Sequence, residues 1–203
     1  MSMWKTVVIV FVLTTLLNSN SYAQRIQDPA LTSGLCINRY DIIVDGFYGY
    51  PYLMGTFLKK FLADSLGVTN SKNYNHVGVR VEYMKWNRIG LGMEYTYALL
   101  TFKYIGKGGY HNAGIARQRL LAKFNYHFAI GKKIDPYLTA GFGYANMKIF
   151  SDEPGVKPMK IPLLPLAFRA GIGMRYFFTQ RMGINAEIGL FGPPFQAGLS
   201  FIL

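Results

Sequence analysis

The sequence predicts an all-β fold, an eight-stranded antiparallel up-and-down transmembrane β-barrel with a short helix in the first external loop. Residues 76–97, HVGVRVEYMKWNRIGLGMEYTY, alternate large apolar side chains with glycines and charged residues. The same alternation recurs along the chain, and the connections between the alternating segments are long and short by turns. Period-two alternation without a long apolar run, together with alternating connection lengths, is typical of membrane-spanning barrels.

Eight segments carry this alternation or can be fitted to it, and each is interpreted as a strand. They are residues 40–50, 76–84, 89–102, 115–129, 136–147, 164–178, 183–191 and 195–203. The long connections are predicted at 51–74, 103–114 and 148–163, and the short ones at 85–88, 130–135 and 179–182. Short turns on one side and longer loops on the other are expected for a barrel in an outer membrane.

The mixed face of these strands is predicted to point into the barrel, while the apolar face meets lipid. An eight-stranded barrel is just wide enough for side chains to fill it, and charges buried there must be paired. The acids assigned to the interior are Asp41, Asp45, Glu82, Glu94 and Glu187, and the bases are Arg80, Arg117, Arg119, Lys123, Arg169 and Arg175. Structural ion pairs are predicted among Arg80, Glu82, Glu94, Arg169, Arg175 and Glu187.

The first 23 residues have the pattern of a signal peptide. Lys5 precedes a short apolar run at 6–17, and Ser21-Tyr22-Ala23 places small residues before a cleavage site. Residues 24–38 are then a periplasmic lead-in, and residues 39–203 are the barrel. Cys36 is the single cysteine, so the chain contains no internal disulfide.

The first long connection contains a predicted helix. In residues 51–67, PYLMGTFLKKFLADSLG, the large apolar residues recur at helical spacing. The helix either packs across the barrel mouth or lies against the outer leaflet or a partner subunit. Its polar face carries Lys59 and Lys60, for which we predict contact with lipid phosphate or with an acidic partner surface. Further lysines in the predicted external loops are Lys72, Lys103, Lys107, Lys148, Lys157 and Lys160.

Three stretches carry a resemblance to a known family: GVRVEY…RIGLGMEYTY, DPYLTAGFGY and AFRAGIGMRYFFTQRMGINAEIG. They resemble the small outer-membrane β-barrel proteins of Gram-negative bacteria, including porin-family or PorT-like proteins and the transmembrane barrel of outer membrane protein A. The resemblance implies export through a cleaved signal peptide to the outer membrane, where lipids, lipopolysaccharide and other envelope proteins are the expected partners. From the residues we expect a non-enzymatic structural or adaptor role in the envelope, such as a subunit of a secretion or assembly complex.

Two alternative functions stay open, a small-solute pore and a barrel enzyme that modifies lipid A. A pore needs more strands than eight. An enzyme needs a nucleophile beside a base, but the mature histidines His76, His111 and His127 lack a clear partner in sequence. His127 does not begin the His-x-Ser pattern expected of lipid A deacylases. No cofactor or metal is expected. The net charge of +12 favours anionic lipid over nucleic acid as the partner of an exported barrel.

Overall fold

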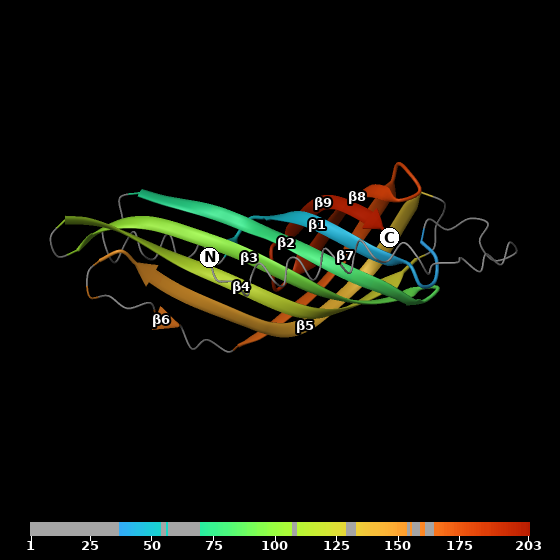
Figure 1. Cartoon of the computed structure of the whole chain (residues 1–203), viewed down its shortest axis with the longest axis horizontal. Helices are drawn as coiled ribbons and strands as arrows, with labels where there is room; N and C mark the ends of the chain where they lie inside the picture. Colours follow the sequence, from blue (N-terminus) through green and yellow to red (C-terminus); the bar gives the residue numbers. More distant parts are fainter. Residues whose placement is uncertain are drawn as a thin grey trace, which may run out of the picture. The chain divides into compact units, whose positions relative to one another are not determined.

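The structure is a computed structural model that describes residues 37–53, 56, 70–106, 109–128, 133–153, 155, 159–160 and 165–203. Nine strands form its single sheet (Figure 1). They are β1 (Ile42–Tyr50), β2 (Asn70–Trp86), β3 (Ile89–Gly106), β4 (Gly109–His127), β5 (Ile134–Ser151), β6 (Met159–Lys160), β7 (Leu166–Phe177), β8 (Met182–Leu190) and β9 (Phe195–Ile202).

Eight of these strands close into an antiparallel barrel. The hydrogen-bonded order is β4-β3-β2-β1-β9-β8-β7-β5, and β5 pairs with β4 to complete the ring. The two-residue strand β6 lies outside this ring and pairs with β5. The predicted fold class is therefore confirmed. Closure satisfies the backbone groups that an open sheet edge would leave unpaired, as a bilayer requires.

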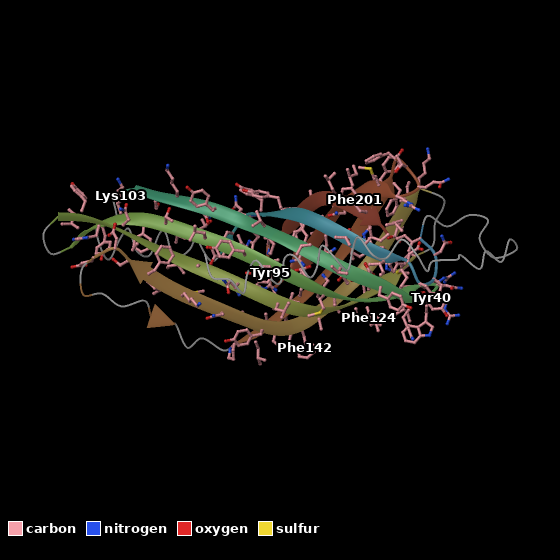
Figure 2. All side chains as sticks on the ribbon, in the orientation of Figure 1. Tyr40, Tyr95, Lys103, Phe124, Phe142 and Phe201 are labelled. Atoms are coloured by element: carbon pink, nitrogen blue, oxygen red, sulfur yellow. The ribbon has the colours of Figure 1, made fainter. Side chains whose placement is uncertain are left out.

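The two faces of the barrel wall follow the predicted alternation. In β7, for example, Phe168, Ile172 and Met174 are exposed to at least half of their surface, while Arg169 and Arg175 are buried. Figure 2 shows the same outward direction for Phe142 of β5, which is 63% exposed. A continuous exposed apolar surface on a closed barrel is the surface that lipid covers.

The strands differ greatly in length. The predicted boundaries between the longest strands and their loops were wrong. β2 to β5 contain 17, 18, 19 and 18 residues, whereas β1, β8 and β9 contain 9, 9 and 8. Figure 1 shows β2 to β5 continuing well beyond the ends of the shorter strands. Most of the predicted loop at 103–114 is therefore strand, because β3 and β4 stay paired as far as Gly106 and Gly109.

We call the continued parts of β2 to β5 the extended wall; it comprises residues 70–76, 97–106, 109–118 and 145–151. A strand of about 18 residues is about 60 Å long, and a tilt of about 40° leaves a height of about 45 Å. The apolar band of an outer-membrane barrel is only about 25 Å tall. The extended wall therefore rises beyond the membrane on the side of the long connections.

Apolar side chains occupy both ends of the interior. On the side of the short turns, one buried cluster consists of Ile37, Ile43, Met84, Phe177 and Ile202. On the inner face of the extended wall, a second cluster consists of Tyr52, Ala98, Leu100, Phe102, Ala113, Ile115 and Met147. The charged residues of the strands lie on the same inward face, at the levels between these clusters.

Two of the predicted segments lie outside the described residues. The signal peptide at 1–23 is one, and most of the helix at 51–67 is the other. At the start of that helix, the Thr56 amide donates to the Tyr52 carbonyl oxygen at 2.9 Å, which is the hydrogen bond of one helical turn. The rest of the helix stays a prediction. The described residues contain no helix with the length and apolar character needed to cross a membrane.

Candidate functional site: the charged barrel interior

Charged side chains from strands far apart in the sequence point into one lumen. They form two groups, the lower cluster nearer the short turns and the upper cluster nearer the long connections. The lower cluster consists of Asp45, Glu82, His127, Asp135 and Arg175. The upper cluster consists of Arg80, Glu94, Lys123, Arg169 and Glu187. All ten side chains are almost completely buried.

Arg175 is the centre of the lower cluster. Its Nη2 lies 2.8 Å from Asp45 Oδ2 and 2.7 Å from Glu82 Oε2, and its Nη1 lies 3.2 Å from Asp135 Oδ2. His127 closes the cluster, because its Nδ1 and Nε2 each lie 2.8 Å from a carboxylate oxygen, of Asp135 and Glu82 respectively. One guanidinium and one imidazole thus share three carboxylates.

Glu187 and Glu94 hold the upper cluster together. Arg169 Nε donates to Glu187 Oε1 at 2.6 Å, and Lys123 Nζ lies 3.2 Å from Glu94 Oε2. Arg80 binds both acids, since its Nη2 lies 2.8 Å from Glu187 Oε2 and 3.0 Å from Glu94 Oε2. Charge-assisted bonds of this length in a water-poor interior are strong, provided that every partner stays in place.

Arg80 and Tyr137 connect the two clusters. Arg80 Nη1 lies 3.3 Å from Asp45 Oδ2 in the lower cluster and donates to the Tyr137 hydroxyl at 3.1 Å. That hydroxyl donates to Glu187 at 3.2 Å, and the Arg175 guanidinium lies 4.6 Å from the centre of the Tyr137 ring. The ring occupies the space that a Cβ on Gly173 would need, so glycine at that position makes room for it.

The structure brings together all six residues for which interior ion pairs were predicted. Asp45 and Lys123, also assigned to the interior, belong to the clusters. Arg119 is buried but forms no ion pair with a described residue, and Arg117 is only half-buried. Asp41 lies just before β1, where its carboxylate accepts a hydrogen bond from the Asn38 amide. Lys59 and Lys60 lie outside the described residues.

Sequence reasoning missed three members of the network. It placed Asp135 in a short turn at 130–135, whereas β5 begins at Ile134, so Asp135 is a strand residue that faces inward. It found no partner for His127, and it gave Tyr137 no role. The alternation of side chains along a strand could have found two of them. Asp135 and Tyr137 lie four and two residues before the inward-facing Thr139, so they share its face.

Neither a metal site nor a hydrolytic site stands out among the described residues. These residues contain no group of three His, Cys, Asp or Glu side chains placed to hold a metal ion. The ring nitrogens of the buried His76 have no hydrogen-bond partner, and His111 Nδ1 lies 3.6 Å from Asp152 at the edge of the extended wall. The charged network is the largest group of interacting buried side chains in the described part of the chain.

Known structures resemble the barrel in fold at low sequence identity. The outer membrane protein OprG from Pseudomonas aeruginosa is 11% identical, and the match covers 83% of this chain and 99% of that chain with a TM-score of 0.50. For the N-terminal β-barrel domain of P. aeruginosa OprF the identity is 15%, with 82% and 100% covered and a TM-score of 0.48. For the E. coli outer membrane protein W the identity is 12%, with 82% and 99% covered and a TM-score of 0.43.

At such identity the likeness to OprG concerns the fold alone. None of the curated proteins matches the sequence. The family model for the outer membrane protein beta-barrel domain matches residues 30–192, which is most of the chain. This match confirms the predicted resemblance to small outer-membrane barrels, and the chain belongs to the outer membrane protein beta-barrel domain family.

Proposed function

We propose that the chain is a non-enzymatic outer-membrane barrel with a closed lumen, which serves as a structural or adaptor element of the envelope. The filled interior carries this proposal. Five acids and five bases are at most 5% exposed and lie across the lumen; they are Asp45, Glu82, Glu94, Asp135, Glu187, Arg80, Arg119, Lys123, Arg169 and Arg175. Nine of them take part in ion pairs that tie strands on opposite sides of the barrel to one another.

A closed lumen predicts that the barrel does not conduct. The full chain, reconstituted in planar bilayers, is expected to give no steady channel, because the paired side chains occupy the space that ions would cross. A porin of about 16 strands, measured in the same membranes, supplies the positive control. Steady conductance steps in most reconstitutions would contradict the closed lumen and favour the pore alternative.

The surroundings of His127 support a non-enzymatic role. A histidine that activates a serine must offer one ring nitrogen to the hydroxyl while an acid holds the other. Both ring nitrogens of His127 lie 2.8 Å from carboxylates, of Glu82 and Asp135, so neither is free for a hydroxyl. This arrangement is that of an ion-pair partner, and it speaks against His127 as the base of a lipid A deacylase.

The extended wall supports the adaptor part of the proposal. A barrel that only spans the membrane needs about 9–11 residues per strand, and β2 to β5 are nearly twice as long. The outer face of this wall carries exposed lysines at Lys72, Lys103 and Lys148, close to exposed Tyr74 and Phe150. We propose that these cations, which lie above the apolar band, contact the phosphates of lipopolysaccharide.

Lys59 and Lys60 belong to the same proposal. Replacing both with glutamate is expected to weaken co-purification of lipopolysaccharide, because each basic residue beside an anionic surface contributes about 1 kcal/mol. Lipopolysaccharide bound per barrel is measured after extraction in mild detergent. The matched control reverses two lysines at the opposite end, Lys85→Glu with Lys133→Glu, and should leave binding unchanged. Binding that resists both the Lys59/Lys60 change and high salt would mean that the contact does not exist.

A further inference from the structure

Arg119 of β4 is a buried cation that forms no ion pair with a described residue, and Glu94 attracts it only at longer range. It is 1% exposed, and its Nη2 donates to the Phe168 carbonyl oxygen at 2.8 Å. Its Nε and Nη1 have no hydrogen-bond partner, and none of the ion pairs among the described residues includes it. The other buried arginines, Arg80, Arg169 and Arg175, each contact at least one carboxylate. A buried guanidinium without full charge compensation is unfavourable, and two nitrogens of this one, Nε and Nη1, have N–H groups to offer.

Arg169 of β7 approaches the same point from the opposite side. Its Nη1 donates to the Pro193 carbonyl oxygen at 3.0 Å, and its Nη2 has no partner. A Cβ placed on Gly192 would lie 2.6 Å from Nη1 of Arg119 and also 2.6 Å from Nη1 of Arg169, so these two nitrogens are no more than about 5 Å apart. Two guanidiniums at this spacing can donate to separate oxygens of one tetrahedral anion.

The nearby carboxylates also face other cations, although Glu94 attracts Arg119 electrostatically and its Oε1 has no hydrogen-bond partner. Glu94 contacts Arg80 and Lys123, and Glu187 contacts Arg80, Lys123 and Arg169. Cations therefore outnumber acids on this side of the upper cluster.

Arg117 adds to the positive character of this region, and the buried His76 lies beside it as a polar neighbour. The half-buried Arg117 lies on the same strand, two residues from Arg119, and forms no ion pair with a described residue. His76 interacts electrostatically with Arg117, Arg119 and Arg169, and both of its ring nitrogens lack a partner. A water molecule could accept the free N–H groups, but it would leave the excess positive charge in place.

We propose that Arg119 and Arg169, with Arg117 and His76 beside them, bind one tetrahedral oxyanion of the phosphate or sulfate class at the loop-side mouth of the barrel. The anion supplies the charge that the carboxylates do not, and the absent Cβ at Gly192 lets both guanidiniums approach it. It is either a free inorganic ion or the phosphate group of a lipopolysaccharide molecule that reaches the mouth.

The test uses the full chain in detergent after lipopolysaccharide has been removed. Sodium phosphate is titrated against sodium chloride at equal ionic strength, and the unfolding midpoint is followed by loss of the compact band on a cold gel. The wild-type midpoint should rise with phosphate and saturate. Arg119→Gln should abolish the rise, and without phosphate this variant should be at least as stable as wild type, since it removes an uncompensated charge. Lys72→Gln, on the outer face, should respond to phosphate as wild type does.

The result is decisive in each direction. A wild-type midpoint that responds alike to phosphate and chloride, or an Arg119→Gln variant that still responds as wild type, would overturn the proposal and leave buried water as the occupant. If Arg119→Gln does not fold, binding of labelled phosphate to wild type and to Arg169→Gln is measured by equilibrium dialysis. Only wild type should bind the label. Displacement of the bound label by lipopolysaccharide would identify the lipid phosphate as the source, and retention of the label would identify the free ion.

Discussion

Arg175→Ala is expected to lower the free energy of unfolding by about 3–5 kcal/mol, the usual cost of removing one partner of a buried ion pair. Arg175 is fully buried and contacts the carboxylates of Asp45, Glu82 and Asp135. Its removal leaves these acids with only His127 and Arg80 as cationic partners. Glu82→Ala should give a loss of the same order. Unfolding in urea, followed by the gel shift between the compact and the unfolded chain, measures the change.

Arg181→Ala is the matched control for this prediction. Arg181 is exposed in the short turn between β7 and β8, and its substitution should change the free energy of unfolding by less than about 0.5 kcal/mol. Lys157→Ala, which lies outside the described residues, is expected to be equally mild. Equal and small losses for the buried and the exposed positions would show that the interior ion pairs do not hold the barrel together.

Tyr137→Ala is expected to cost about 3–5 kcal/mol, the usual range for removing a large buried ring. Tyr137 is 1% exposed, and its hydroxyl connects Arg80 with Glu187 across the lumen. Tyr137→Phe keeps the ring and removes only the hydroxyl, so it should cost about 1.5–3 kcal/mol, typical of hydrogen bonds to charged groups. The same urea unfolding measurement distinguishes the two variants.

Phe142→Ala provides the comparison on the opposite face of the same strand. Phe142 projects toward lipid and is 63% exposed, so its truncation creates no internal cavity (Figure 2). A loss for Phe142→Ala as large as that for Tyr137→Ala would contradict the assignment of the two faces. The combined Arg175→Ala, Tyr137→Ala variant should lose less than the sum of the single losses, because the guanidinium lies over the ring at 4.6 Å.

Within the strands that it located, the sequence by itself determined which side chains face inward. Facing in a strand is a local property, because successive side chains point to opposite sides. A run such as Leu166–Phe177 therefore shows its lipid face and its interior face without knowledge of any other strand. The number of strands and the fold class followed from the repetition of this pattern. The positions of Arg80, Glu82, Glu94, Arg169, Arg175 and Glu187 on the interior face followed for the same reason.

The tertiary structure alone decided where the strands end and which charges meet. The long strands β3 and β4 continue past the membrane because hydrogen bonding between neighbouring strands does not depend on lipid. The point where the apolar alternation stops therefore did not mark the ends of these strands. Contacts across the lumen depend on the tilt and stagger of the strands, which bring Asp45 of β1 to Arg175 of β7, 130 residues away. The same stagger leaves Arg119 without an ion pair among the described residues, although acids and bases on the interior face are nearly equal in number.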